Sequence, residues 1–284
     1  MKKAKKIIEV SCPAKINLFL SIGNFNEKKK LHNINLINQT INLYDKITIE
    51  RNNKHEGINI ITNSNIPKDY TNSAYQACQK FYEYINESYD GIDIKIDKNI
   101  PNMAGLGGES TDAAGVLLGL NKWYRKLKKE ELIFLASQIG SDVPYFIVDG
   151  FAHVQGCGKK VESLKEENIY KHYLIIKPNF TMNTKEMFKK LKTLNLSTTI
   201  NPSDLFHNDF MYVMPDELKK LREFLLTNYK DLQHCLSGSG SSYYIASKTT
   251  ILNHIKKDIL ANFPDYTLYS QESCNRHKII IKIL

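Results

Sequence analysis

The sequence lacks any long hydrophobic run. No stretch of about 18 apolar residues without charge occurs in it, which excludes a transmembrane helix. Behind the basic start MKKAKK, the apolar run is only Ile7 and Ile8 before Glu9, too short for the core of a signal peptide. We therefore expect a cytoplasmic protein without a membrane partner.

Cysteine is scarce and scattered. The five cysteines lie far apart and form no Cys-x-x-Cys pair. An odd number of isolated cysteines indicates neither a disulfide framework nor a zinc site, and it fits a reducing cytosol. The cysteines are Cys12, Cys78, Cys157, Cys235 and Cys274.

Arginine is nearly absent, although the net charge is +9. Only Arg51, Arg125, Arg222 and Arg276 are arginines, so lysine supplies almost all of the positive charge. Lysine, asparagine and isoleucine dominate many segments together, which indicates a compositional bias rather than a basic binding face. Since arginine provides the planar, bidentate contacts that read nucleic acid bases, we expect no nucleic acid partner.

The remaining composition is that of a folded protein with room for two domains. Its 284 residues are 42% hydrophobic and 24% charged, close to the averages for soluble globular chains. The polar run KKVESLKEEN at residues 159–168 predicts a boundary between an amino-terminal domain, 1–158, and a carboxyl-terminal domain, 159–284.

The first half is dominated by segments rich in β-branched residues, which predict strands around residues 7–10, 16–22, 47–50 and 58–62. The clearest strand alternates Ile92, Ile94 and Ile96 with charged residues. A period of two places these isoleucines on one buried face. This strand runs directly into the glycine-rich segment PNMAGLGGESTDAA, residues 101–114.

Helical spacing follows the glycines. Ala113, Leu117 and Leu120 predict a helix, for which the polar residues 110–112 are candidate caps. A second helix is predicted by the apolar spacing across residues 132–139, with Gly140 as a left-handed C-terminal cap.

Beyond this helix, the stretch FIVDGFAHV places Asp149 and Gly150 between two apolar runs, which predicts a tight hairpin. The carboxyl-terminal stretches YLIIKP, LSGSGSSYYIAS and HKIIIKIL, with helical patterns near 184–192 and 251–261, predict a second α+β unit.

A strand, a glycine-rich turn and a helix start together can bind an anion. The first amide groups of a helix lack partners within the helix, and glycine lets a ligand approach the backbone closely. The G-K-[ST] ending of a P-loop is absent, and Ser110 stands where a dinucleotide fingerprint has its third glycine. Taken alone, the loop is either a phosphate site or a structural turn.

Four segments occur in the order of a known family: PAKINLFL, residues 101–111, GSDVP and LSGSGSS. With them the chain resembles the GHMP kinase superfamily over nearly its whole length. Within that superfamily it resembles the branch that uses ATP to phosphorylate the 2-hydroxyl of a cytidine-diphosphate-linked methylerythritol, in the non-mevalonate route to isoprenoid precursors. The resemblance implies an α+β, two-domain fold, with an amino-terminal domain like that of a ribosomal protein and a ferredoxin-like carboxyl-terminal domain.

The resemblance implies that the glycine loop binds the phosphates of ATP. It also implies Mg²⁺ as a cofactor, but it does not assign the residues that would hold this ion. Glu109 departs from the family pattern, which has a small residue there. It either points outward, helps to hold Mg²⁺, or is an exposed acid favoured by the helix dipole. The implied ATP-binding residues are Pro101, Asn102, Met103, Ala104, Gly105, Leu106, Gly107, Gly108, Glu109, Ser110 and Thr111.

The resemblance also identifies Asp142 as the catalytic aspartate and Lys15 as its partner. A hydroxyl that attacks a phosphoryl group loses a proton, which a carboxylate can accept, and a lysine can offset the developing negative charge. Taken alone, Asp142 is instead expected as an N-cap before Pro144, and Lys15 as a surface residue of a strand.

The acceptor pocket implied by the family includes His32, which would read the cytosine edge, and Phe188 as one wall. Here the family's D-G-Y-H is Lys29, Lys30, Leu31 and His32, so the turn glycine and the second stacking aromatic are missing. The implied acceptor-binding residues are Asn17, His32, Asp142, Thr184, Phe188, Gly238, Ser239 and Gly240.

Several alternatives stay open. Asn17 can be a turn or core amide, and the glycines at 238 and 240 can form an ordinary strand-end turn. The altered cytosine pocket allows a GHMP kinase for another small hydroxylated acceptor, and the basic charge allows, remotely, an RNA-binding protein without kinase activity. For the adenine pocket we expect Asn72 and Lys98, and for the assembly a monomer or homodimer.

Overall fold

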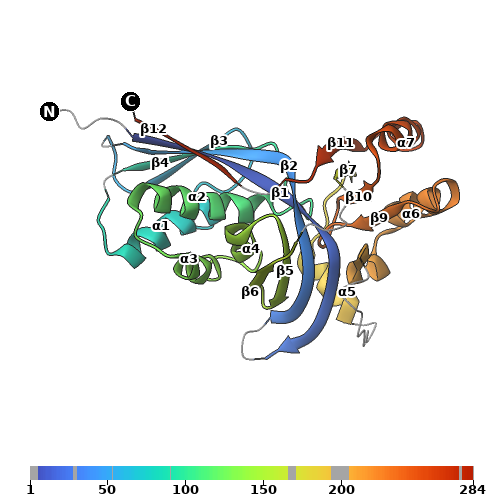
Figure 1. Ribbon diagram of the computed structural model, residues 1–284, viewed down its shortest axis with the longest axis horizontal. Coiled ribbons are helices and arrows are strands. Elements are labelled where there is room, and N and C mark those ends of the chain that lie inside the picture. Colours follow the sequence, from blue (N-terminus) through green and yellow to red (C-terminus); the bar gives the residue numbers. More distant parts are fainter. Residues whose placement is uncertain are drawn as a thin grey trace.

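The computed structural model of the chain describes residues 6–27, 31–52, 54–89, 91–165, 171–192, 205–274 and 277–283. It contains one sheet of eight strands and one of four. In Figure 1 the two long strands β1 (Lys6–Asn26) and β2 (Leu31–Arg51) bend downward between the first group of helices and the second sheet. This mixture of helices and sheets confirms the predicted α+β class.

The strands β1 and β2 form one antiparallel hairpin along nearly their whole length. The expectation of short separate strands around residues 7–10, 16–22 and 47–50 was therefore wrong in extent. Pairing along the hairpin carries the backbone through the polar residues that interrupt the apolar pattern, because strand formation depends on neighbouring strands more than on local propensity.

The first sheet has the strand order β12-β1-β2-β4-β3, with β5, β6 and β8 attached at the long hairpin. Its clearest predicted strand, β4, is confirmed, since Ile92, Ile94 and Ile96 are fully buried. The remaining strands are β3 (Ile58–Thr62), β4 (Ile92–Asp97), β5 (Phe151–Gly156), β6 (Lys160–Ser163), β8 (His207–Asn208) and β12 (Lys278–Ile283).

Four helices pack below the first sheet, as Figure 1 shows. They are α1 (Ser73–Ile85), α2 (Gly108–Tyr124), α3 (Lys129–Ala136) and α4 (Val143–Val148). Helix α2 lies close to β1 because it presents Gly115 and Gly119 to that strand. A Cβ atom at Gly115 would lie 2.3 Å from the Cys12 Sγ, so a larger residue does not fit.

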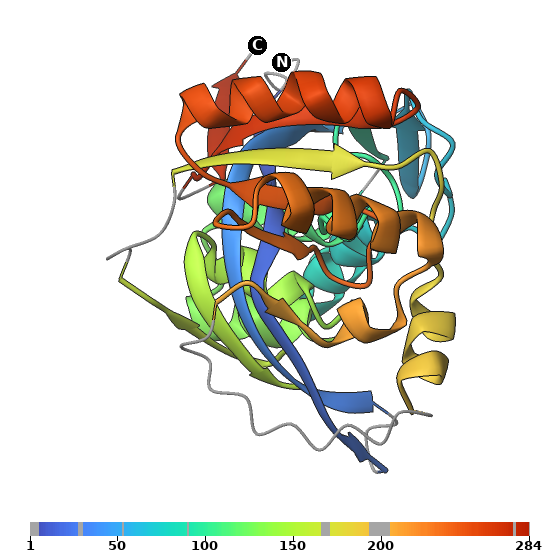
Figure 2. The ribbon, with the colours of Figure 1, turned by 90° about the vertical axis from the view of Figure 1, so that its right-hand side faces the viewer.

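The second sheet has the order β11-β7-β10-β9 and faces the viewer in Figure 2 together with its helices. Its central strand β7 is buried from Tyr173 to Ile176. The predicted helices near 184–192 and 251–261 are confirmed. The elements are β7 (His172–Lys177), α5 (Thr184–Lys192), a 3-10 helix η1 (Asp209–Val213), α6 (Asp216–Asn228), β9 (Gln233–Leu236), β10 (Tyr243–Ala246), α7 (Thr249–Asn262) and β11 (Thr267–Glu272).

The last strand joins the first sheet, against expectation. Segment HKIIIKIL was placed in the second unit, but β12 pairs antiparallel with β1, with Ile8 opposite Ile281. An apolar run shows that a strand is buried and leaves its partner unspecified, which explains the error. Strand β6, past the expected boundary at 159, also pairs with β5 of the first sheet. The division at that boundary stays a prediction.

Three local predictions were wrong. Helix α2 begins earlier than expected, with the left-handed Gly107 at its N-cap position, so residues 110–112 lie inside its first turn. Helix α3 ends at Ser137 in a right-handed conformation, and Gly140 does not adopt a left-handed φ. Asp149 and Gly150 do have positive φ, but they connect helix α4 to β5 instead of two strands.

None of the helices in the described ranges combines the length and the hydropathy that crossing a bilayer requires.

Candidate active site

A cavity of about 640 Å³ lies where the glycine loop meets β1, β2, α5 and the turn between β9 and β10. It brings together most of the residues that the sequence singled out from five separate segments. Of the predicted site residues, it is lined by Lys15, Asn17, Pro101, Asn102, Met103, Ala104, Gly105, Leu106, Gly107, Gly108, Glu109, Ser110, Asp142, Thr184, Phe188, Gly238, Ser239 and Gly240. Thr111 and His32 are not among the lining residues.

The glycine loop is held from both sides. On one side, the Lys15 backbone N–H donates to the Leu106 carbonyl at 2.9 Å. On the other side, the Ser237 hydroxyl donates to the Gly105 carbonyl at 3.0 Å, which ties the loop to the second sheet. Gly105 needs to be glycine because its φ is +74° and a Cβ atom would lie 2.0 Å from the Ser237 carbonyl oxygen.

The loop ends at the start of α2, where Gly107 occupies the N-cap position without any side chain to cap the helix. The next amide groups therefore have no side-chain partner at this position and can bind an anion. A Cβ atom at Gly107 would lie 2.8 Å from the Phe146 ring and 3.1 Å from the Lys15 Cγ. The turn thus packs directly against both the lysine and helix α4.

Lys15 enters the cavity from the buried middle of β1. Its side chain is 3% exposed, and its Nζ lies 2.6 Å from the Asn17 Oδ1 and 3.7 Å from the Asp142 Oδ2. Burial lowers the pKa of the Lys15 ammonium, while the nearby Asp142 carboxylate acts in the opposite direction. The pair therefore combines a cation that is poorly hydrated with a carboxylate that is 31% exposed.

Asp142 occupies the N-cap position of α4, followed by Val143 and Pro144, but its side chain makes no capping hydrogen bond. The sequence allowed either an N-cap or a partner for Lys15. The structure gives Asp142 the N-cap position in the chain while its carboxylate faces the lysine.

Asn17 is a buried amide with partners on both sides. It lies two residues from Lys15 on the same strand face, accepts from that lysine, and donates from Nδ2 to the Asn38 Oδ1 at 2.7 Å. The Tyr244 hydroxyl donates to the Asn17 carbonyl at 2.9 Å, which links this strand to the second sheet. Asn38 and Tyr244 support the site from behind, and nothing in their local sequence identifies them.

His32 contacts Phe188, which lines the cavity. Their rings stack with centroids 5.2 Å apart and planes inclined by 16°. The His32 Nδ1 is 3.1 Å from the Gly23 carbonyl, and Phe188 packs edge-on against Phe210. The predicted partners of one pocket therefore lie together, although they come from β2 and α5.

Leu31 opens β2, but its side chain lies outside the described part of the structure, and Lys29 and Lys30 lie outside the described residues. Of residues 29–32, which replace the family's D-G-Y-H, the structure therefore describes only the side chain of His32.

The turn at residues 238–240, within the segment LSGSGSS, is fixed by two residues. The Thr184 and Ser239 hydroxyl groups are 2.7 Å apart, which joins α5 to the turn after β9. The buried Asn208 donates to the carbonyls of Leu236 and Gly238, each at 2.8 Å. Asn208 was not predicted, because an isolated asparagine carries no signal of this role.

The apolar wall of the cavity was also missed. It is formed by Leu20 and Ile22 of β1, Ile34 and Leu36 of β2, and Phe210. The period-two spacing of Ile34 and Leu36 could have identified a common face, but the partner of that face is set by tertiary structure.

Lys98 lies beside the loop in a buried ion cluster. Its Nζ donates to Asp112 at 2.7 Å and also to Asp45, whose Oδ1 accepts from the Asn99 and Ile100 amides. Burial, reinforced by the negative charge of Asp45 and opposed by Lys98, raises the pKa of Asp112 to about 8. Lys98 is thus already bonded to two acidic side chains.

Asn72 caps helix α1 through its side chain, which accepts from the Ala74 amide at 2.8 Å. With Glu109 and Asp112 it borders a small hollow of about 30 Å³. The assignment of Asn72 and Lys98 to an adenine pocket stays a prediction.

Glu109 and Thr111 point to opposite environments. Glu109 is exposed in the first turn of α2 and lines the cavity. Thr111 is completely buried, and its hydroxyl lies 3.0 Å from the His277 Nε2. The Thr111 hydroxyl thus lies behind the loop, and the assignment of this residue to the ATP site stays a prediction.

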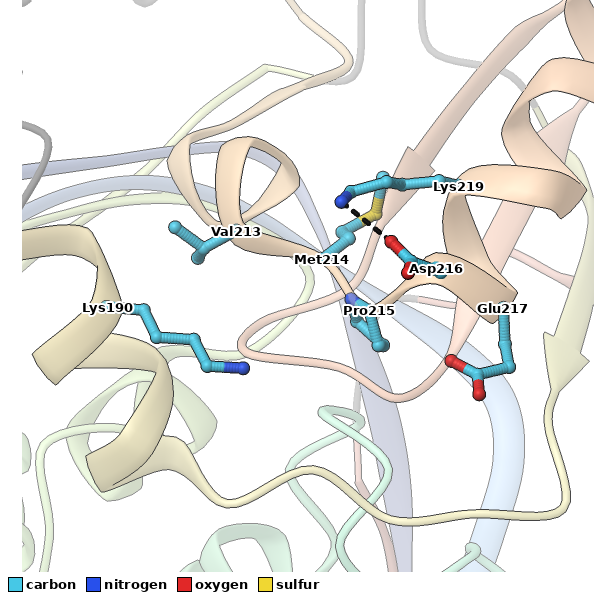
Figure 3. Close-up of a pocket in the computed structure, with 7 residues that line it drawn as sticks. All are labelled: Lys190, Val213, Met214, Pro215, Asp216, Glu217 and Lys219. Carbon is cyan, nitrogen blue, oxygen red and sulfur yellow. Dashed lines mark hydrogen bonds and ion pairs between the residues drawn. The ribbon is translucent and has the colours of Figure 1, made fainter.

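A second cavity, of about 510 Å³, lies between α5 and the start of α6. Figure 3 shows side chains of both charges around it, with Lys219 paired to Asp216. None of the predicted site residues lines it. The lining residues are Lys190, Val213, Met214, Pro215, Asp216, Glu217 and Lys219.

Within the described residues, no group of three or more His, Cys, Asp or Glu side chains is arranged to hold a metal ion.

Known proteins resemble the chain in sequence and fold. Residues 72–150 match the model of the GHMP kinases N terminal domain. The chain is 35% identical over 252 residues to the 4-diphosphocytidyl-2-C-methyl-D-erythritol kinase of Francisella tularensis subsp. tularensis, a match covering 86% of this chain and 88% of that protein.

Solved structures share the fold over nearly their full length. A crystal structure of 4-(cytidine 5'-diphospho)-2C-methyl-D-erythritol kinase superposes with a TM-score of 0.73 at 24% identity, covering 93% of this chain and 99% of that one. Homoserine kinase from Cytophaga hutchinsonii gives a TM-score of 0.71 at 18% identity, covering 96% of this chain and 97% of the other. Both likenesses concern the fold.

Proposed function

This chain belongs to the 4-diphosphocytidyl-2-C-methyl-D-erythritol kinases of the GHMP kinase family, and we propose that Asp142 and Lys15 carry its phosphoryl transfer. The donor is ATP, and the acceptor is the 2-hydroxyl of 4-diphosphocytidyl-2-C-methyl-D-erythritol. The observation that carries the assignment of roles is the 3.7 Å approach of the Lys15 Nζ to the Asp142 Oδ2 beside the glycine loop.

The carboxylate of Asp142 is the proton acceptor. Phosphoryl transfer needs an oriented hydroxyl whose proton leaves as the new O–P bond forms, and a carboxylate within reach of that hydroxyl can take the proton. The ammonium group of Lys15, fixed by Asn17 at 2.6 Å, offsets the negative charge that develops on the transferred group. Since Lys15 is buried, its charge acts with little screening by water.

The triphosphate of ATP lies on the glycine loop and on the first amide groups of α2. Two observations support this placement: Gly105 and Gly107 have left-handed backbones that bring main chain to the cavity surface, and the N-cap of α2 is free of a side-chain cap. Both features suit a phosphate that bonds to N–H groups at a helix start.

Mg²⁺ fits this arrangement as an ion carried by the nucleotide. It takes one or two protein oxygen ligands and otherwise phosphate oxygens and water, so a cluster of acidic residues is not required. Ser110 and Glu109, which both line the cavity, are suited to hold it. When bound, Mg²⁺ neutralises charge on the phosphates.

The cytosine ring lies at the mouth of the cavity, beside Phe188 and His32. Phe188 is half-buried and offers one aromatic face, and the His32 imidazole can act as hydrogen-bond donor and acceptor toward a base edge. Because the two rings stack on each other at 5.2 Å, the base takes the place of His32 on the Phe188 face, and His32 moves to the edge of the base. Base stacking on one aromatic ring contributes about 1 to 3 kcal/mol.

The test is Asp142→Asn, which keeps the size of the side chain and removes the proton acceptor. We expect kcat to fall by about a hundred- to ten-thousand-fold, while the affinity for ATP stays nearly the same. Asp216→Asn, at an exposed aspartate beside the second cavity, is the matched control and should leave kcat unchanged. An unchanged turnover in Asp142→Asn would refute the role of this residue.

A panel of hydroxyl acceptors tests the substrate separately. ATP consumption is measured with the cytidyl substrate, homoserine and mevalonate at equal concentrations. The proposal requires a preference for the cytidyl compound. A preference for an acceptor without cytidine would leave the kinase assignment intact and overturn the assignment of the cytosine pocket.

A further inference from the structure

The hydroxyl group of Thr111 faces away from the cavity and toward the carboxyl-terminal end of the chain. Thr111 lies in the first turn of α2, three residues after Gly108 begins the helix, and its own amide donates to the Gly107 carbonyl at 2.9 Å. Its Oγ1 lies 3.0 Å from the Nε2 of His277, immediately before β12. The phosphate-binding turn is therefore linked through one residue to the last strand.

His277 bonds to a second element on its other side. The side-chain Nδ1 and the backbone N–H of His277 lie 2.8 Å and 2.6 Å from the same carboxylate oxygen, the Asp149 Oδ2. The other oxygen of Asp149 accepts from the Gly150 amide at 2.9 Å. The side chains of His277 and Asp149 are only 3% and 6% exposed, so water competes little for these bonds.

Asp149 directly follows helix α4, and that helix begins after Asp142. Phe146, in the same helix, contacts the Gly107 turn and lies edge-on to the His277 ring at 6.2 Å. His277 thus connects the start of α2, which follows the glycine loop, with the end of α4, the helix whose N-cap is the proposed proton acceptor Asp142.

A hydroxyl, an imidazole and a carboxylate in this order also form the catalytic triad of many hydrolases. The location of Thr111 excludes a role as nucleophile. Thr111 has no exposed surface and does not line the cavity, so no substrate carbon or phosphorus can reach its oxygen. A nucleophile must contact the group that it attacks. Thr111, His277 and Asp149 therefore hold neighbouring elements in place and do not react with a substrate.

We propose that His277 is a positioning residue, which sets the distance between the phosphate-binding turn and Asp142 by bonding to Thr111 and Asp149. This role rests on the proposed function, in which ATP lies on the glycine loop and Asp142 accepts the proton. Phosphoryl transfer is sensitive to such spacing, because a misplacement of about 1 Å can cost two orders of magnitude in rate. The carboxyl-terminal segment thereby becomes part of the support of the active site.

Two single substitutions remove the bond between α2 and His277 by different routes. Thr111→Val removes the hydroxyl at nearly constant volume. In His277→Asn the shorter amide can still donate to Asp149 but no longer reaches Thr111. We expect each to lower kcat/KM for ATP about tenfold and to leave the KM for the cytidyl substrate unchanged. The double variant should be no worse than either single one, since both remove the same bond.

Matched variants separate positioning from general damage. Thr111→Ser keeps a hydroxyl and should retain nearly the activity of the unmodified protein. His254→Asn, at a histidine of α7 whose side chain is 73% exposed, should change nothing. Hydrogen exchange should become faster at the amides of residues 107–111 in His277→Asn and remain unchanged in β4.

The proposal is overturned if Thr111→Val and His277→Asn fold and keep kcat/KM for ATP, or if they weaken both substrates alike. Should His277→Asn fail to fold, Thr111→Val against Thr111→Ser decides the question. Failure of the proposed function would show differently: the unmodified protein would then transfer no phosphate, while the exchange experiment would still report whether the bond holds the turn.

Discussion

The side chain of Lys15 places an ammonium group where water hardly reaches. Burial lowers the pKa of this group, and the neighbouring Asp142 carboxylate partly compensates. The charged form of lysine exists below its pKa, so a lowered pKa moves the loss of charge toward neutral pH. In the proposed mechanism, the residue that supports transfer is therefore also the residue that limits activity at alkaline pH.

We accordingly expect kcat/KM to decrease as the pH rises and Lys15 loses its proton. The decrease should begin at a lower pH than the ordinary lysine pKa of about 10.4 would give. In Lys15→Arg the guanidinium stays charged at all these pH values, so the alkaline decrease should disappear from whatever activity remains. The measurement is a pH profile of kcat/KM, with Lys219→Arg on α6 as control. An alkaline decrease that persists in Lys15→Arg would assign it to another group.

At the scale of single residues, the proximity of the predicted site residues could be read from the sequence to a large extent. Lys15 and Asp142 were identified through motifs, and the structure places them 3.7 Å apart. Their supports could not be predicted, because Asn38, Asn208 and His277 act through partners that only the folded chain brings near. Thr111 shows the limit of a motif: its position was recognised, and its side chain points the other way.

At the scale of elements, α2 connects the glycine loop to the core, and it does so through close contact with β1. A Cβ atom at Gly115 would lie 2.3 Å from the Cys12 Sγ, whereas at Gly119 the nearest atom would be a Val10 methyl carbon at 3.1 Å. Both glycines face the same strand, but an added Cβ atom would clash more severely at Gly115 than at Gly119.

Gly115→Ala should lower the free energy of unfolding by about 1 to 3 kcal/mol through overpacking, and Gly119→Ala by less. Denaturation in urea measures both. Combining Gly115→Ala with Cys12→Ala removes the clashing sulfur, so the double variant should lose less stability than the sum of the two single changes. Strict additivity would show that the helix moves away from the strand instead.

The elements differed in how far their own sequence specified them. Strand β4, the loop and α2 form one local unit, and the alternation of isoleucines with the following glycines predicted its order correctly. For α4 the start was expected, with Asp142 as an N-cap before Pro144, but its end was predicted to be a strand because its residues VPYFIV favour strands. For β12 the pattern predicted a strand but not its sheet, since that choice depends on distant partners.

At the scale of the whole molecule, pH acts on stability through the buried cluster of Lys98, Asp45 and Asp112. The pKa of Asp112 is raised from 3.8 to about 8, chiefly by burial. The folded state thus holds a proton that the unfolded state releases. A raised carboxyl pKa contributes stability below the unfolded value, and this contribution is lost as the pH rises toward about 8.

The free energy of unfolding should therefore decrease between pH 5 and pH 8, by up to about 1.4 kcal/mol per pH unit from this group. Asp112→Asn, which is neutral throughout, should reduce that slope, and the exposed Asp265→Asn should not. Urea denaturation at several pH values provides the comparison. Equal slopes in the unmodified protein and Asp112→Asn would exclude Asp112 as the group responsible.

The pairing of β12 with β1 has a consequence for the time at which the protein becomes complete. Strand β1 is synthesised first among the described elements and β12 last, yet they are neighbours along six residue pairs. Until β12 has been synthesised, β1 lacks this neighbour and Thr111 lacks His277. Domains near the amino terminus usually fold as they emerge. Here the first sheet gains its β12 edge only after the second sheet has been synthesised, so the order of assembly differs from the order of synthesis.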